Sequence, residues 1–394
     1  MNADYLLIIP LFLAVGAGWW LGRFQSRALR QEQERKDSLN REYFIGLDYL
    51  INEKTDEAIE SFIRALEINS DTIPAHLTLA KLFRRKGDVE RAIGIHQKLL
   101  ARPDLSRQDF LRVQMALARD YDALGLLDRA ENLLSDIIHQ ASSQDMRRKA
   151  QTLLIKLYEK EGEWQQALDT ASRLQTQDLR EIRHELAHYC CELAQREMAG
   201  NSAGAEHFLR QALLYDPNCA RASLIRAQLQ IEAGRWRQAI KSLKQVLDQD
   251  ALLVSETIPL LQRCYTELNA LAEFEGYLRA CLSKAPSASV IIALADRIGQ
   301  QKGVHAAGIF LTEELKKRPS IKGFNRLIDL HIEYGSSSAR QSLTVLRGLT
   351  GQLEQRKPVY QCNHCGFAGR TLHWQCPSCK QWNSIRPIQG LEGE

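Results

Sequence analysis

Four cysteines near the end of the sequence have the spacing of a metal site. Cys362 and Cys365 form one C-x-x-C pair, and Cys376 and Cys379 form a second. In such a turn both thiolates face one ion, while backbone N–H groups donate hydrogen bonds to the sulfurs. Four thiolates in a tetrahedron suit iron or zinc. We therefore predict one iron ion, with zinc as the alternative, at these four residues.

The segment that carries these cysteines, residues 357–388, is too short to fold by burial alone. We expect Phe367, Trp374 and Trp382 to form only a small apolar cluster, so the ion must supply much of the folding free energy. Four protein ligands leave no open position for a substrate, which favours a structural or docking role. The segment has no acidic residue and several basic ones, so we expect it to dock on an acidic surface.

A second motif, His184-Glu185-Leu186-Ala187-His188, matches H-E-x-x-H. On a helix its two imidazoles could hold zinc, with Glu185 as general base. However, the segment fits the packing phase of a repeat helix, and no third ligand is marked. We favour solvent-facing or capped histidines. The sequence shows no Gly-rich phosphate loop, nucleophile elbow or paired-acid site, so we predict that the chain is not an enzyme.

The elements that must position these residues repeat along the chain. A small residue is followed four positions later by a large apolar residue, and three later by another small or apolar residue, as in Ala58, Phe62 and Ala65. Further copies centre on Ala92, Ala130, Ala167, Ala205, Ala239, Glu273, Ala307 and, as an end unit, Ala339. The period of about 34 residues predicts an all-α superhelix of about nine helix pairs over residues 41–350.

Glycines and prolines punctuate this pattern. Turns between paired helices are expected at Gly87, Gly162 and Gly234, and second helices should stop before Pro217, Pro286 and Pro319. Gly46 is expected where two helices cross closely. Stacked pairs form a hollow that usually grips a peptide or a protein surface.

The first residues have the features of a membrane anchor. Residues 5–22 carry no charge and would span about 27 Å as a helix, near the thickness of a hydrocarbon core. A cleaved signal peptide would need a positive leading region, which is missing. We predict a single transmembrane anchor at residues 1–22 and a charged connector at residues 23–40. Arginines follow the apolar run and none precedes it, which places the body of the chain in the cytoplasm.

Composition narrows the function classes. The chain has 394 residues, 44% of them hydrophobic, and a net charge of +4, so it is neither disordered nor a typical nucleic-acid binder. Five cysteines lie outside the C-x-x-C pairs without regular spacing. We predict that they are buried free thiols in a reducing compartment: Cys190, Cys191, Cys219, Cys264 and Cys281.

The repeats resemble the tetratricopeptide repeat, and the cysteine segment resembles the rubredoxin-like or zinc-ribbon type. In this order they resemble the lipopolysaccharide assembly protein B family of Gram-negative bacteria. The cysteine pairs and residues 374–379 and 385–391 carry this resemblance most specifically. It implies a single-pass inner-membrane protein that faces the cytoplasm, with the four cysteines as metal ligands. It also implies a regulator of lipopolysaccharide synthesis that helps a membrane AAA+ protease degrade the UDP-acyl-GlcNAc deacetylase of the lipid A pathway.

Mechanistically, we expect an adaptor whose partners are that protease, the deacetylase, other lipopolysaccharide assembly proteins and, as a further candidate, a second copy of the chain. We expect the metal segment to pack against the last repeat, because only residues 351–358 separate them. The alternative is an electron carrier with a rubredoxin-type iron site. The gap between the cysteine pairs is shorter than in electron-carrying rubredoxins, which argues against it.

Overall fold

The computed structural model describes Trp19 and residues 41–68, 72–334 and 337–394. The predicted membrane anchor and charged connector, Trp19 apart, lie outside the described residues. Among the residues that are described, no helix is both long and apolar enough to cross a bilayer. The chain divides into two compact units, residues 1–161 and 162–394.

The first unit is built of antiparallel helices. A helix over residues 41–51 is followed by α2 (Thr55–Ile68), α3 (Ile73–Lys86), α4 (Val89–Leu100), α5 (Arg107–Ala123), α6 (Leu127–Gln140) and α7 (Gln144–Glu161). Gly46 lies where the first two helices cross, since a Cβ there would come within 3.0 Å of the Phe62 ring. The close crossing predicted at Gly46 is confirmed.

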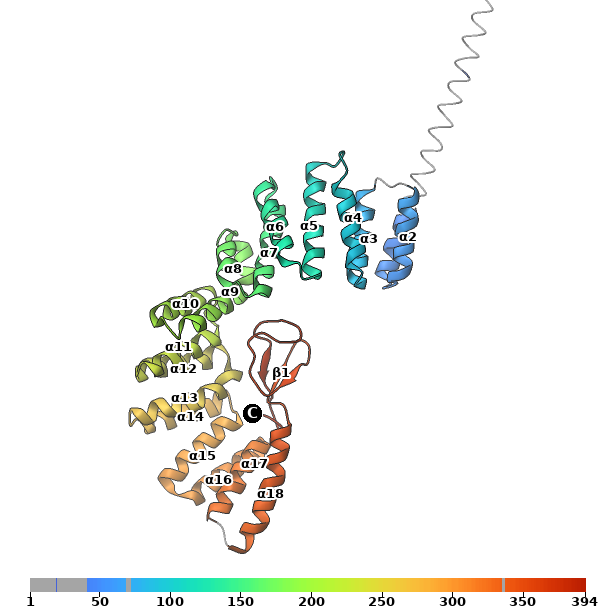
Figure 1. The fold of residues 1–394 in the computed structure, drawn as a ribbon. Helices are drawn as coiled ribbons and strands as arrows, with labels where there is room; N and C mark the ends of the chain where they lie inside the picture. The colour runs from blue at the N-terminus through green and yellow to red at the C-terminus, as the bar shows by residue number, and fades with distance from the viewer. Residues whose placement is uncertain (1–18, 20–40, 69–71, 335–336) are drawn as a thin grey trace, which may run out of the picture. The chain divides into compact units, whose positions relative to one another are not determined.

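The second unit continues the helix pairs and ends in a small sheet (Figure 1). Its helices are α8 (Trp164–Ala171), α9 (Thr176–Glu197), α10 (Ser202–Tyr215), α11 (Ala220–Glu232), α12 (Trp236–Gln249), η1 (Ala251–Leu253), α13 (Val254–Glu267), α14 (Leu271–Lys284), α15 (Ala288–Lys302), α16 (Val304–Lys317), α17 (Ile321–Tyr334) and α18 (Ser337–Arg356). The strands β1 (Tyr360–Cys362), β2 (Ala368–Gly369) and β3 (Ile385–Pro387) form an antiparallel sheet in the order β2-β1-β3. We call residues 357–387 the ribbon.

The predicted repeat pattern is confirmed. Every signature position falls in an even-numbered helix, and the signature alanines of α2, α4, α6, α8, α10, α12 and α16 are buried. Gly87, Gly162 and Gly234 all have positive φ between paired helices. Prolines follow the ends of α10, α14 and α16. The cysteines outside the C-x-x-C pairs are buried free thiols, as predicted.

Three copies depart from the predicted pattern. In the end unit in α18, Ala339 and Leu346 are exposed rather than buried. In α14 the signature position is Phe274 rather than Glu273, because Phe274 is fully buried with Leu278 while Glu273 is exposed. In α4 the expected large apolar residue is His96, which is buried. Its Nδ1 lies 2.5 Å from Asp120, which also pairs with Arg84, so the core accepts this ring because one of its nitrogens has a polar partner.

The end of the array extends further than predicted. Helix α18 continues past residue 350 to Arg356, so most of the expected linker is helical. Its outward side chains, Val345, Leu346, Leu349 and Leu353, are largely exposed. This is the pattern of a terminal unit that no further repeat covers.

The position of Phe274 in the repeat can be tested by truncation. Phe274→Ala should lower the free energy of unfolding by about 3–5 kcal/mol, since it leaves a cavity in a packed core. Glu273→Ala should change it by less than about 0.5 kcal/mol. Denaturant titration of the full-length chain measures both changes. Equal effects of the two substitutions would show that the assigned phase is wrong.

Candidate metal centre and its docking surface

The ribbon brings the four predicted cysteines together. Cys362 ends β1 and pairs with Ile385 of β3, while the other three cysteines lie in the turns between strands. Each C-x-x-C turn is followed by a residue with positive φ, Gly366 at 78° and Lys380 at 58°. The expected left-handed glycine is therefore present in the first turn, and the second turn places a lysine in the same conformation.

The four sulfur atoms have the geometry of a tetrahedral site. All lie within 4.8 Å of one another, with Cys362 and Cys379 Sγ 3.8 Å apart and Cys365 and Cys376 Sγ 3.6 Å apart. A tetrahedron with metal–sulfur bonds of about 2.3 Å has an edge of about 3.8 Å. The donor set therefore fits one zinc or iron ion. No other cluster of three or more metal-ligating groups occurs among the described residues.

The surroundings favour the thiolate at Cys362 and Cys365 but not at Cys379. Burial opposes ionisation of Cys362, but contacts with Ser384 Oγ and the backbone N–H groups of Cys365 and His364 outweigh it and lower its pKa to about 6. The sulfur lies 3.3 Å from Ser384 Oγ and 3.4 Å from the His364 nitrogen. The pKa of Cys365 is also lowered, first by the backbone N–H of Phe367. The backbone N–H of Gln381 lowers the pKa of Cys379, but desolvation and the neighbouring cysteine sulfurs outweigh it and raise that pKa to about 12. Ionised sulfurs are the form that a metal binds.

The ribbon has a very small apolar core of its own. Cys362, Cys376 and Ile385 are buried, with Tyr360 and Phe367 among the half-buried side chains around them. The predicted cluster of Phe367, Trp374 and Trp382 is wrong in part. Only Phe367 packs in the ribbon core, whereas the two tryptophans turn outward onto the helices of the second unit.

Trp382 lies in an aromatic box formed by α8 and α9. Its ring stacks on His188, with centroids 4.9 Å apart and planes at 15°. Trp164 and Tyr189 meet the same ring edge-on, at centroid distances of 6.0 and 6.1 Å. Offset-stacked and edge-on contacts of this kind add to the stability gained from burying the rings.

Trp374 covers the neighbouring helices. With Leu372 it packs on Ala220, Val246 and Leu253, from α11, α12 and η1.

The Arg221 guanidinium lies over both tryptophans, 5.9 Å from the Trp374 ring and 5.8 Å from the Trp382 ring. Arg221 is only 3% exposed, and it donates to Glu192 and Gln195. Arg221 thus has an acidic partner and lies against two aromatic rings. It can hold the ribbon in place without leaving an unpaired charge in the interior.

Polar contacts close the rim of this surface. Arg386 pairs with Asp250 at 2.8 Å, and the Tyr360 hydroxyl donates to Glu256 at 2.8 Å. The prediction that the basic segment docks on acidic groups is confirmed at one residue, Arg386, which pairs with Asp250. The expected packing against the last repeat is wrong, because the ribbon docks on α8, α9 and α11–α13 (Figure 1). Burial of its two tryptophans there outweighs proximity along the chain.

The H-E-x-x-H motif is divided between two roles. His184 is half exposed, and its Nδ1 lies 2.8 Å from Asp216. His188 is buried under Trp382, so the expectation of a solvent-facing or capped histidine is wrong for this residue. Burial first, then the charge of Arg221, lowers the pKa of His188 to about 3, so it is neutral at physiological pH.

Sequence reasoning did not identify His188, Arg221 and Trp374 as docking residues. His188 and Arg221 are buried on α9 and α11, and no spacing in the sequence marks them as docking residues. The one available signal was the position of the two tryptophans, which flank the second cysteine pair.

The docking surface can be tested by comparing the two motif histidines. His188→Ala should release the ribbon, because it removes the stacking partner of Trp382 and exposes the Arg221 charge. His184→Ala is the control and should leave the ribbon docked. Limited proteolysis of the metal-loaded full-length chain measures release as cleavage within residues 357–387. Equal cleavage of the two variants would contradict the assignment.

Known proteins are similar to this chain over nearly its whole length. The family model described as a rubredoxin metal binding domain matches residues 360–387, and tetratricopeptide repeat models match residues 75–109 and 198–252. Lipopolysaccharide assembly protein B of Escherichia coli K12 is 37% identical over 98% of this chain and 99% of its own length. The protein of that name from Haemophilus influenzae is 33% identical over the same shares. A solved tetratricopeptide repeat protein from Parabacteroides merdae is 13% identical, with a TM-score of 0.28, and covers 80% of this chain and 99% of its own. From the near full-length identity with the two curated relatives, we conclude that this chain belongs to the lipopolysaccharide assembly protein B family.

Proposed function

We propose that the chain is a membrane-tethered adaptor that restrains lipid A synthesis. In this role it presents the committed-step UDP-acyl-GlcNAc deacetylase to a membrane AAA+ protease for degradation. The observation that carries the adaptor role is the docking of a metal-type ribbon on the repeats through Trp382 and His188. The name of the relatives supports the connection to lipopolysaccharide.

The docked ribbon supports a scaffold role because it makes a composite surface. It covers parts of α8, α9 and α11–α13, so a partner of the second unit meets ribbon and repeat side chains together. The two faces are fixed before any partner arrives, which lowers the ordering cost of binding. A partner that binds the repeats of this region must therefore contact the surface that the ribbon leaves uncovered.

Tethering is the second part of the proposal. An anchor at residues 1–22 would hold the chain in the bacterial inner membrane, with the repeats in the cytoplasm. Confinement to the surface where a membrane protease works raises the effective concentration of the two proteins. Other lipopolysaccharide assembly proteins and a second copy of the chain are further partners that we propose.

The metal has a structural role in this proposal. Cys362, Cys365, Cys376 and Cys379 would hold one iron or zinc ion, and so fix the loops that present Trp374 and Trp382 to the helices. The alternative is an electron carrier, which the exposure of Cys365 favours, because electrons enter most easily through a solvent-facing ligand. A reversible one-electron transition in the iron-loaded chain would support the carrier, and its absence would support the adaptor.

The adaptor role can be tested in cells with the double substitution Cys362→Ser and Cys365→Ser. This variant should lose the metal, release the ribbon and lengthen the half-life of the deacetylase at least about threefold, because an undocked ribbon cannot form the composite surface. His364→Ala is the matched control, since this exposed side chain lies between the two cysteines. The half-life is measured after protein synthesis is stopped. An unchanged half-life in a metal-free variant would refute the role of the ribbon.

A further inference from the structure

The residues that follow β3 fold back into a closed loop, which we call the strap (residues 388–394). The Ile388 nitrogen donates to Val359 of the ribbon, the Glu394 nitrogen donates to the Ile388 carbonyl, and the Gly390 nitrogen donates to the Glu394 carbonyl. A Cβ at Gly393 would lie 1.8 Å from the Ile388 carbonyl oxygen, so only glycine fits there. The strap is therefore a built element that begins at the edge of the ribbon.

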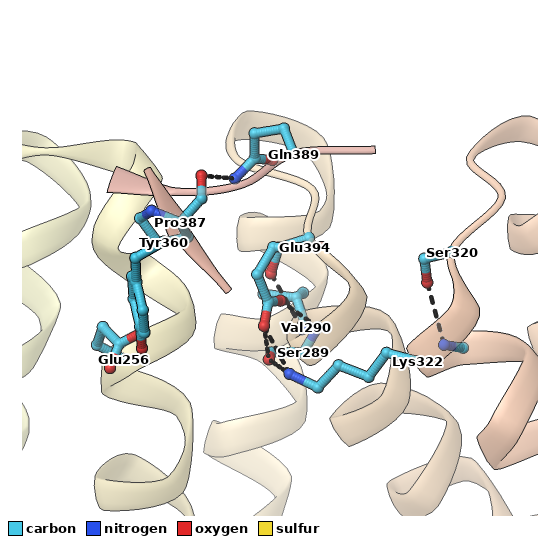
Figure 2. A network of polar contacts seen from close by, with 11 residues as sticks. Glu256, Ser289, Val290, Ser320, Lys322, Tyr360, Pro387, Gln389 and Glu394 are labelled. Carbon is cyan, nitrogen blue, oxygen red and sulfur yellow. Dashed lines mark hydrogen bonds and ion pairs between the residues drawn. The ribbon is translucent and has the colours of Figure 1, made fainter. Parts of the chain in front are cut away.

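The carboxylate of Glu394 is bound by two helices (Figure 2). Its Oε2 accepts from the backbone N–H of Ser289 at 2.8 Å, and its Oε1 accepts from the Ser289 hydroxyl at 2.8 Å. Lys322 of α17 donates to the same Oε1 at 2.5 Å. The side chain of Glu394 is only 7% exposed. One carboxylate thus accepts three hydrogen bonds, one of them from a cation.

A second contact lies beside the first. The backbone N–H of Ile321, the first residue of α17, donates to the Leu391 carbonyl at 2.8 Å. The first N–H groups of a helix have no partner within the helix. Ser287 and Ser320 each accept one such N–H, from Val290 and from Gly323. The strap therefore supplies acceptors for N–H groups that the caps of α15 and α17 leave open.

These contacts belong to one row of the array. Glu256, Ser289 and Lys322 lie in the first turns of α13, α15 and α17, the first helices of successive pairs. All three face the ribbon or the strap, since Glu256 accepts from Tyr360 and the other two bind Glu394 (Figure 2). Repeat arrays use such rows of equivalent positions to bind extended chains.

We propose that this row is a binding site for an extended acidic segment of a partner protein, and that the strap occupies it as a displaceable internal ligand. The site selects a backbone carbonyl followed three residues later by a carboxylate, as Leu391 and Glu394 supply them. The proposal does not depend on the adaptor function, since peptide binding can be measured without any protease or deacetylase.

One interaction opposes the seating of the strap. Glu256 accepts from Tyr360 beside the strap, and the charge of Glu394 acts on its carboxylate. Burial first, and the Glu394 carboxylate to a smaller extent, raise the pKa of Glu256 against the lowering effects of the Tyr360 hydroxyl and the Lys322 charge. Two carboxylates that repel each other weaken the seating of the strap. A partner that places its acidic group on Lys322 without approaching Glu256 avoids this repulsion.

The test uses a fluorescein-labelled peptide with the sequence of residues 388–394 and the full-length, metal-loaded chain. In the unaltered chain the strap competes at high effective concentration, so the peptide should bind weakly. Glu394→Gln removes the charged acceptor and should free the site, so the peptide should bind at least about 10-fold more tightly, as measured by fluorescence anisotropy. Glu392→Gln is the matched control, because Glu392 pairs with Lys357 outside the site, and it should behave as the unaltered chain.

Two further measurements make each outcome decisive. Adding Lys322→Ala to the Glu394→Gln chain should abolish the gain, and so should a peptide with glutamine at its last position. Hydrogen exchange at the Ser289 amide reports whether the strap has left. The proposal is overturned if Glu394→Gln exposes this amide without a gain in peptide binding. It is equally overturned if the amide stays protected, because Glu394 then does not hold the strap.

Discussion

The packing of Trp374 and Trp382 on helices α8, α9, α11 and α12 is the interaction on which the arrangement of the second unit depends. The ribbon has too few apolar residues to cover its own tryptophans, and its core consists mainly of two cysteines and one isoleucine. The helices provide what the ribbon lacks, with His188 under one ring and Arg221 over both. Neither surface is complete alone, since an undocked array would expose a buried arginine as well as an apolar face.

This dependence links the cysteine site to distant helices through direct contacts. Cys362 ends β1, which pairs with β3, and β3 leads into the strap seated on α15 and α17. Trp374 and Trp382 flank the other cysteine pair and reach α8, α9 and α11. Ordering of the four cysteines therefore bears on both the docking surface and the strap, and we regard the ribbon as the part that integrates this unit.

Much of the fold follows from the sequence because it depends on local periodicity. The spacing from Ala58 to Ala307 predicts the second helix of each pair, and the two C-x-x-C pairs predict the cysteine cluster. The local pattern gave the wrong position in α14, where the buried residue is the aromatic Phe274 and not the charged Glu273. It also failed for the docking site, because contacts between His188 and Trp382 join residues far apart in the chain. The repeat period does not predict a contact between residues so far apart. The short separation of the ribbon from the last repeat, residues 351–358, had indicated docking there instead.

We expect an ordered metal centre to keep the ribbon docked over His188. The most direct measurement is an NMR titration of the histidine rings in the full-length chain, zinc-loaded and then stripped of metal, with His184 as the internal reference. In the loaded chain His188 should stay neutral down to about pH 4, consistent with its lowered pKa of about 3. In the stripped chain it should titrate near its ordinary value of about 6.5. A His188 ring that remains neutral to the same low pH after the metal is removed would contradict this expectation.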